Sequence, residues 1–312
     1  MLDVKRLQVL REVAAQGSFS AAAESLGYSQ PAISQQITAL ERETGTTLVA
    51  RNARGVRLTD AGRALVEHSA AILARVAAAE QELEAIAGLR GGRVRLASFS
   101  TAGATLVPLA IARFSHQHPA VELSLVEAEP EDAIPQLKSG QLDVALTFRY
   151  SPLPSSDYES MHEDVDIAHL LDDPMYVALP TDHPLARRRT IRLADLSAES
   201  WVQGDHNGLC GKMHIAACER AGFEPRVGFQ VDDYNVVQGL VAAGVAISLL
   251  PELALTNLRD DVVIRSLGDE APVRHVGAVT LAGGYRSPAV EAMLETLRQA
   301  ADQYRARARA AA

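Results

Sequence analysis

Two short amphipathic segments separated by a glycine, within residues 18–40, constrain the fold of this chain more than any other feature. Gly27 can end the first helix in a left-handed conformation, and Ser29 is a suitable N-cap for the second. Pro31 is tolerated in the first turn of a helix, because no intrahelical hydrogen bond is lost there. The pattern predicts two helices packed around a tight turn, supported by an earlier helix at residues 3–15. Their apolar faces are Phe19, Ala22, Ala23 and Leu26, then Ile33, Ile37 and Leu40.

The outward face of the second helix is polar but carries no charge. Amide side chains can pair bidentately with adenine and small side chains permit close approach, so this face suits the major groove of DNA. An ordinary α-hairpin with a polar outer face would show the same local pattern. The residues of this face are Gln30, Pro31, Ser34, Gln35 and Thr38.

The distribution of charge agrees with a DNA-binding N-terminus, although the net charge of −9 by itself argues against one. Residues 1–60 carry seven basic and six acidic side chains, a balance of +1, so the remainder carries −10. Arg51, Arg54 and Arg57 lie within seven residues without an acidic side chain among them. A basic hairpin on an acidic body can hold phosphate while limiting non-specific binding, and a merely solvated hairpin is the alternative.

The same region predicts two short strands at residues 47–51 and 56–59, with a turn at residues 52–55. Arg54 lies at the tip of this turn and is the candidate to enter a minor groove, where narrowed A·T tracts attract arginine. Arg51 is the candidate phosphate contact.

A long helix is expected at residues 60–87, with Thr59 and Asp60 as its cap. Its apolar positions alternate in steps of four and three, which is typical of a coiled-coil seam about 40 Å long. The small residues of the seam favour close antiparallel pairing, whereas a lone amphipathic helix is the alternative. Pairing would present two DNA-binding helices to an interrupted inverted repeat. The seam consists of Leu65, Ser69, Ile72, Val76, Ala79, Leu83 and Ile86.

Strand-like and helical segments alternate after three glycines at positions 88, 91 and 92. This alternation predicts an α/β fold with an open, mostly parallel sheet, arranged as two lobes joined by crossovers near residues 162–170 and 266–275. Strands are expected at 94–99, 121–126, 142–148, 175–179, 201–202, 227–231, 245–250 and 276–281, and helices at 103–116, 131–139, 208–221, 233–243 and 288–307.

The N-terminal landmarks resemble the winged helix-turn-helix of LysR-type transcriptional regulators. One position departs from the family pattern, because Val49 stands where an aromatic residue is usual. The landmarks are Gly17 to Ser20, Ala22, Ala23, Leu26, Ser29 to Ala32, Ser34, Ile37, Leu40, Glu41, Gly45, Leu48, Arg51 and Leu58 to Gly62.

The resemblance implies a winged helix-turn-helix at residues 1–59, a dimerisation helix at 60–88 and an effector domain like periplasmic binding proteins at 93–312. The first lobe would span about 93–162 and 275–312, and the second about 163–274. It also implies a cytoplasmic dimer or tetramer that binds double-stranded DNA and a small effector, with RNA polymerase as a further possible partner. Base contacts would come from Gln30, Pro31, Ser34 and Gln35, and phosphate contacts from Ser29, Thr38 and Arg51.

Ligands of such sheets bind beyond the carboxyl ends of strands, which indicates candidate effector contacts. Ser98, Ser100 and Thr101 could hold an anion together with the N–H groups of the next helix, although plain N-caps would look the same. Arg149 could add a bidentate anion contact or pair with an acid of the other lobe. The sequence therefore predicts a small organic anion as the effector. The remaining candidates are Phe148, Gln203 and Phe229.

A stripe of His206, Cys210, His214 and Cys218 recurs every four residues, as metal ligands on one helical face would. The three steps between these four residues span about 18 Å along a helix, so a single tetrahedral site cannot use all four side chains. Buried cysteines and a partly exposed histidine explain the stripe without a metal, and no cofactor is predicted. Two cysteines are also too few for a disulfide framework.

Other classes of protein find less support in the sequence. The glycines around Lys212 lack the spacing of a phosphate loop, and no nucleophile elbow or metalloprotease motif occurs, so an α/β enzyme is disfavoured. A solute-binding protein for transport would share the two lobes but would need an export signal and no helix-turn-helix. No run of about 18 apolar residues occurs, so no membrane partner is expected.

Overall fold

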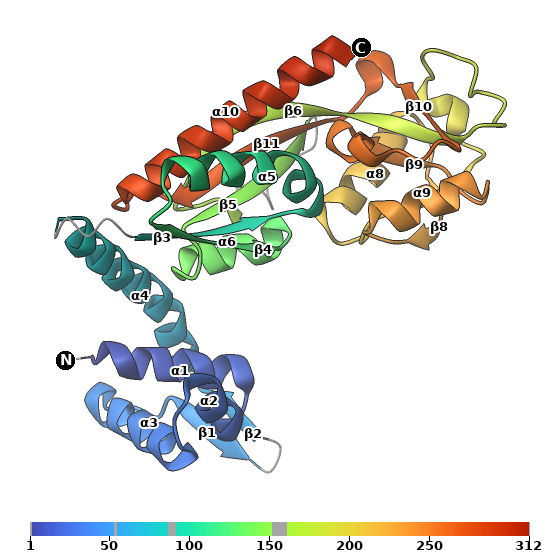
Figure 1. The fold of residues 1–312 in the computed structure, drawn as a ribbon. Coiled ribbons are helices and arrows are strands. Elements are labelled where there is room, and N and C mark those ends of the chain that lie inside the picture. Colours follow the sequence, from blue (N-terminus) through green and yellow to red (C-terminus); the bar gives the residue numbers. More distant parts are fainter. Residues whose placement is uncertain (1, 53–54, 87–91, 152–160, 312) are drawn as a thin grey trace.

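The computed structural model describes residues 2–52, 55–86, 92–151 and 161–311. A small helical domain lies at the N-terminal end, a long helix leads away from it, and a larger α/β body follows (Figure 1). None of the helices in these ranges is long and apolar enough to cross a lipid bilayer.

Three helices and a two-stranded hairpin form the N-terminal domain. Its core buries Ile33, Ile37 and Leu40 of the third helix completely against the first two helices. Val49 packs into the same core at 6 % exposure, so a β-branched residue fills the place where an aromatic is usual. The elements are α1 (Val4–Gln16), α2 (Phe19–Leu26), α3 (Gln30–Thr44), β1 (Val49–Asn52) and β2 (Gly55–Leu58).

Two glycines determine how the elements of this domain are connected and packed. Gly27 ends α2 at φ +67°, and Ser29 begins α3 by accepting a hydrogen bond from the N–H of Ala32. Gly55 has φ +126°, and a Cβ there would lie 2.8 Å from the carbonyl oxygen of Gly17. This close approach, possible only for glycine, holds the hairpin against the turn between α1 and α2.

The long helix α4 (Asp60–Ile86) is capped by the preceding residue, Thr59, whose hydroxyl accepts a hydrogen bond from the N–H of Gly62. Its first half packs on the N-terminal domain, where Ser69 is fully buried. Its second half is more open, and Leu83 is 65 % exposed. The two halves of the helix therefore have different environments.

The α/β body is built on one path of strands in the order β10-β6-β11-β5-β3-β4, with β9 also pairing with β6. Strands β4, β3 and β5 run parallel, and β11 lies antiparallel between β5 and β6. The elements of lobe I are β3 (Gly92–Ser98), α5 (Ser100–Gln117), β4 (Val121–Glu127), α6 (Pro130–Lys138), β5 (Val144–Ser151), β11 (Val273–Leu281) and α10 (Pro288–Ala311).

Alternation along the strands covers both faces of the lobe I sheet. Leu96 and Leu146 belong to the large core on the side of α5 and α10, whereas Ala97 and Ala145 belong to the core under α6. Figure 1 shows α5 and α10 lying across one face and α6 on the other. Lobe II comprises η1 (Leu193–Leu196), β7 (Ser200–Gln203), α8 (Leu209–Arg220), β8 (Arg226–Gln230), α9 (Tyr234–Ala242), β9 (Ser248–Pro251), η2 (Glu252–Asn257), β10 (Val262–Ser266) and η3 (Gly268–Glu270).

The chain passes between the lobes within β6 (Val165–Pro180), a strand that both lobes share. Residues 165–174 pair with β11 in lobe I, and residues 175–180 pair with β9 and β10 in lobe II. The sequence predicted only the segment 175–179 as strand and placed a crossover at 162–170. The earlier half of β6 escaped notice because polar residues interrupt it, and β10 was also missed.

Candidate functional site

The outward face of α3 has the polar character that the sequence indicated. Gln30, Pro31 and Gln35 are exposed, while Ser34 and Thr38 are half-buried, all opposite the buried face of the helix. Ser29, also exposed, precedes them. Such a surface can approach the edges of base pairs without repulsion from acidic side chains.

The hairpin β1–β2 is fixed to α3 by a carboxylate. Glu41 Oε1 accepts hydrogen bonds from the N–H groups of Leu48 at 2.9 Å and Val49 at 3.2 Å. On the hairpin, Arg51 pairs with Val56 in the strand register, and its side chain lies outside the described residues, as does all of Arg54. Helix α3 and the hairpin are thus joined into one surface.

A cavity of about 430 Å³ lies between the two lobes of the α/β body, at the ends of strands β3, β5 and β7. Lobe I contributes the start of α5, the start of α6 and the end of β5, and lobe II contributes β7, α8 and the segment before α9. The position agrees with the general location of ligands in open α/β sheets. The lining residues used below are Ser100, Glu129, Glu131, Asp132, Phe148, Tyr150, Gln203, Asp205, Cys210, His214, Asp232, Tyr234 and Arg274.

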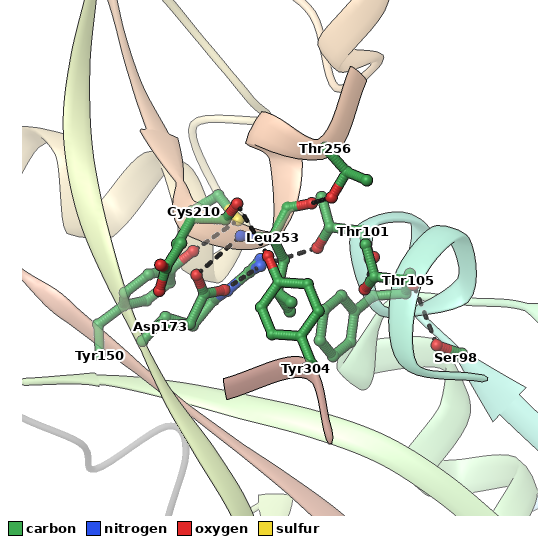
Figure 2. Close-up of polar contacts among 12 residues, drawn as sticks. Ser98, Thr101, Thr105, Tyr150, Asp173, Cys210, Leu253, Thr256 and Tyr304 are labelled. Atoms are coloured by element: carbon green, nitrogen blue, oxygen red, sulfur yellow. Dashed lines mark hydrogen bonds and ion pairs between the residues drawn. The ribbon is translucent and has the colours of Figure 1, made fainter. Parts of the chain in front are cut away.

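Arg274 forms the floor of this cavity and is 1 % exposed. Its Nε and Nη2 donate to Asp173 Oδ2 at 2.9 and 2.6 Å, and Nη2 also donates to Thr101 Oγ1 at 2.8 Å. The guanidinium lies over the rings of Phe99 and Phe148, about 5 Å from each centroid. Figure 2 shows Asp173 and Thr101 converging on this point.

Asp173 is itself fully buried and links the floor to lobe II, because its Oδ1 accepts a hydrogen bond from the N–H of Leu253 at 3.0 Å. Burial works to lower the pKa of Arg274, but Asp173, Tyr150 and Tyr234 raise it above its ordinary value. The arginine therefore stays charged, and its charge is balanced inside the protein.

The walls of the cavity are acidic. Glu131 Oε1 accepts a hydrogen bond from the N–H of Leu209 at 3.0 Å, so a carboxylate of lobe I occupies the N-terminus of α8 in lobe II. The carboxylate of Glu129 faces the cleft and has no hydrogen bond or ion pair to any described residue. Removal from bulk water and the neighbouring Glu131 raise the pKa of Glu129 to about 7.

Three buried polar atoms of lobe II have no partner among the described residues: Trp201 Nε1, which is not on the cavity wall, and Gln203 Oε1 and His214 Nε2. The side chains of Gln203 and His214 line the cavity, and each is 3 % exposed. Burial lowers the pKa of His214 to about 4, so this imidazole is neutral near pH 7. Buried polar groups are nearly always satisfied, so the two atoms on the cavity wall indicate a place for a polar ligand or ordered water.

The comparisons with known proteins divide the chain at α4. The family described as "Bacterial regulatory helix-turn-helix protein, lysR family" matches residues 4–63, and "LysR substrate binding domain" matches residues 87–302. The chain belongs to the LysR-type transcriptional regulators. It is a DNA-binding transcriptional regulator with a substrate-binding domain, and the curated relatives are regulators, not enzymes.

Relatives of this LysR-type regulator match along nearly its whole length. The "Probable HTH-type transcriptional regulator LrrA" of Synechococcus elongatus is 32 % identical over 309 residues, covering 98 % of this chain and 99 % of that protein. The "Hydrogen peroxide-inducible genes activator" of Dickeya chrysanthemi is 29 % identical, with 96 % and 95 % covered. The solved structure of full-length CbnR complexed with its target DNA is 24 % identical and shares the fold, with a TM-score of 0.63 over 96 % of this chain and 100 % of that one.

The predicted effector contacts of this regulator lie in different places. Ser100, Phe148 and Gln203 line the cavity, and Thr101 bonds to the arginine beneath it. Ser98 is buried behind them, where its hydroxyl donates to the carbonyl of Phe99. Two residues do not line the cavity and are exposed elsewhere: Arg149 and Phe229.

Arg149 misses the cavity because side chains alternate along β5. Phe148 and Tyr150 point toward the cavity, so the residue between them points away. The cation of the site is instead Arg274, which pairs with Tyr150 across the strands. A lone arginine within the apolar strand 273–281 was the available signal, but its partners are over 100 residues away in sequence.

The histidine and cysteine stripe does not form a metal site within the described ranges, where no three such side chains or carboxylates gather around one point. His206 precedes α8 and is exposed, whereas His214 and Cys218 are buried. Cys210 Sγ lies 3.2 Å from the hydroxyl of Tyr150 at the edge of the cavity (Figure 2). The stripe therefore contributes separate side chains to packing and to the cavity.

Proposed function

We propose that this regulator binds an interrupted inverted repeat through α3 of two subunits, and that a small effector in the interlobe cavity changes this binding. The observation that carries the proposal is the pair of unpartnered buried atoms, Gln203 Oε1 and His214 Nε2, that face a cavity between two lobes. A ligand there would touch both lobes at once. By binding one arrangement of the lobes more tightly, it would shift the equilibrium between their open and closed arrangements.

The cavity lacks one of the anion contacts that the sequence suggested. The anion partner expected there, Arg149, is exposed outside it, and the guanidinium of Arg274 is already balanced by Asp173. The N-terminus of α8, another site for an anion, is occupied by Glu131. We therefore place the effector in the interlobe cavity without requiring it to be an anion.

The DNA side of the proposal rests on the uncharged exposed face of α3 and on pairing of subunits through α4. Base contacts would come from Gln30, Pro31, Ser34 and Gln35, and Ser29 and Thr38 would contact phosphate with the hairpin arginines. Contact with RNA polymerase and a cytoplasmic location are further expectations from the family.

Peroxide sensing, suggested by the name of the Dickeya relative, is disfavoured by the two thiols. Burial raises the pKa of Cys210 to about 11 and that of Cys218 to about 12. The thiolate is the form that peroxide oxidises, so both groups are poorly prepared for that chemistry. They also lie eight residues apart on one helix, about 12 Å along its axis, too far for a disulfide.

A paired DNA and ligand experiment tests the proposal on the full chain. Footprinting on the DNA upstream of its own gene should reveal two protected half-sites, and metabolites that raise the melting temperature should change their pattern. The variant Ser100→Trp fills the cavity from a half-buried position and should keep DNA binding but lose the ligand effect. Ligands that act equally on this variant would place the effector elsewhere.

A further inference from the structure

The interlobe cavity is surrounded by negative charge from both lobes. Among the described lining residues, lobe I contributes three acidic side chains and lobe II two, against one arginine on the floor. An adjoining cavity, also about 430 Å³, shares Glu129 and Asp232 and has no lysine or arginine among its described lining residues. Its further acidic residues are Glu127 and Asp233. The electrostatic field of the whole cleft therefore attracts cations.

Most charged groups of the cavity already have partners within the protein. Arg274 is paired with Asp173, and Glu131 holds the N-terminus of α8. Asp205 accepts a hydrogen bond from Gln230 at 3.0 Å, and Asp232 accepts one from the N–H of Asp205 at 2.9 Å. Glu129, at the start of α6, and Asp132 on the same helix are exposed to the cleft, and neither side chain has a hydrogen bond or ion pair to a described residue.

A second observation points to a ligand and to its chemistry. The buried carbonyl oxygen of Gln203 accepts no hydrogen bond within the described chain, and it lines the same cavity as Glu129. Both groups are acceptors that lack a donor. A ligand that satisfies them must bring hydrogen-bond donors, N–H or O–H, and a positively charged N–H donor would balance the carboxylate as well.

We infer that the effector of the proposed function carries a cationic nitrogen group, an ammonium or a guanidinium, that binds between Glu129 and Gln203. The inference rests on the proposed effector site and adds the chemical class of its ligand. The cation replaces the missing positive charge of the acidic cleft and supplies the donors that Gln203 lacks. The paired Arg274 beneath it keeps the floor rigid and does not compete for the acceptors.

The ionisation of Glu129 makes this binding depend on pH. Desolvation and then Glu131, Asp232 and Glu127 raise the pKa of its carboxyl to about 7, against the opposing effect of Arg274. A cation binds the charged carboxylate, so affinity should fall about tenfold from pH 8 to pH 6 as Glu129 is protonated. His214 is neutral throughout this range. The other charged or titratable groups facing the cavity are Asp132, Asp205, Tyr150, Tyr234 and Cys210.

The test uses two five-carbon probes of opposite charge, the diamine cadaverine and the dicarboxylate glutarate, together with the guanidinium agmatine. Calorimetric titration of the full chain at constant ionic strength should show binding of the two cations and none of glutarate. Glu129→Gln should weaken cadaverine at least about tenfold and abolish the pH dependence. The matched control Glu122→Gln, an exposed acid on β4 of the same lobe, should leave both unchanged.

The outcomes separate this inference from the effector site itself. Absence of cation binding, or affinity unchanged in Glu129→Gln, overturns the inference. Glutarate binding that is lost in Ser100→Trp would also overturn it while supporting the cavity as the effector site. Cadaverine binding that survives Ser100→Trp would place the cation outside the cavity and overturn the inference.

A ligand-free measurement provides a second check. The folded-state pKa of Glu129 lies above its ordinary value of 4.5, so the folded chain favours the protonated acid. Stability should therefore decrease as pH rises from about 4.5 to about 7 through this group. Glu129→Gln should raise the melting temperature more at pH 8 than at pH 5, and an equal effect at both would contradict an unpaired carboxylate.

Discussion

Arg274 is the residue whose surroundings most directly connect the two lobes. It is fully buried, and its partner Asp173 also accepts a hydrogen bond from the backbone of lobe II. Removing one member of a buried ion pair leaves the other uncompensated, so Arg274→Met should cost about 3–5 kcal/mol of unfolding free energy. Urea denaturation followed by circular dichroism measures this cost.

Arg149→Met is the control for that experiment, since this arginine is exposed on the neighbouring strand and should change stability by about 0.5 kcal/mol or less. The double variant Arg274→Met with Asp173→Asn should recover part of the loss, because no charge is then stranded. Equal costs for Arg274→Met and Arg149→Met would contradict the buried pair.

The thiols of Cys210 and Cys218 provide a second prediction for single residues. Burial raises the pKa of both, to about 11 and about 12, so at pH 8 the thiolate fraction of Cys210 is about one in a thousand. The folded chain should react with a disulfide reagent at pH 8 more than about a hundredfold slower than the urea-unfolded chain. Rapid reaction of one thiol in the folded chain would show that it is ionised.

On the DNA side, Gln35 is an exposed amide at the centre of the recognition face of α3. Gln35→Ala should cost roughly 1–3 kcal/mol at the cognate operator, because a bidentate pair with a base is lost. Mobility-shift titrations measure it, with Gln36→Ala as control, since Gln36 accepts a hydrogen bond from Arg6 within the domain. An equal loss on random DNA would exclude base recognition.

Contacts within one segment could be predicted from the sequence, whereas contacts between distant segments could not. The polar face of α3 could be predicted because helical spacing places it opposite Ile33 and Ile37 within one segment. Glu129 and Arg274 could not be predicted as neighbours, because their approach depends on strand register and on the meeting of two lobes. The exposed position of Arg149 likewise follows from a one-residue alternation along β5.

Among the elements, α4 connects the DNA-binding domain to lobe I by close packing. A Cβ added at Gly140, after α6, would lie 2.9 Å from the Cα of Ala74 in α4. Nearby, Arg11 donates to the carbonyl of Ser139 and Gln81 donates to Asp143, each at 3.2 Å. These contacts join α1 and α4 to the segment of lobe I that follows α6.

Gly140→Ala should break this packing. Its backbone has φ +71°, so alanine adds strain of about 1–2 kcal/mol, and the new methyl group pushes α4 away. Gly244→Ala is the matched control, with φ +70° and open space around the added Cβ. Small-angle scattering should show a larger radius of gyration only for Gly140→Ala, and the same radius in both variants would contradict the contact.

Among the strands too, those with a regular local pattern could be predicted and the first half of β6 could not. The winged domain, α4 and the parallel strands of lobe I could be predicted because each has a regular apolar pattern within a short segment. The half of β6 at residues 165–174 reads as polar, yet it forms a strand because β11 pairs with it along its length. Long-range pairing, which local pattern does not contain, overrides propensity there.

For the whole molecule, the exposure of the α4 seam bears on whether the chain pairs with a second copy. Leu65 and Ile72 pack partly on the N-terminal domain of their own chain, whereas Val76 is half-buried and Ala79 and Leu83 are exposed. The side chain of Ile86 lies outside the described residues. An apolar stripe at coiled-coil spacing that remains open on one chain favours cover by a second copy.

Leu83→Glu should therefore weaken the dimer, because the carboxylate would be buried in the seam without a partner. We expect the dimer dissociation constant to rise at least about tenfold, or about 1.4 kcal/mol, in sedimentation experiments. Operator affinity should fall with it, while binding of a single half-site should not change, since α3 is intact. Glu80→Ala, off the seam on the same helix, should leave both unchanged, and a dimer unaffected by Leu83→Glu would show that the subunits pair through another surface.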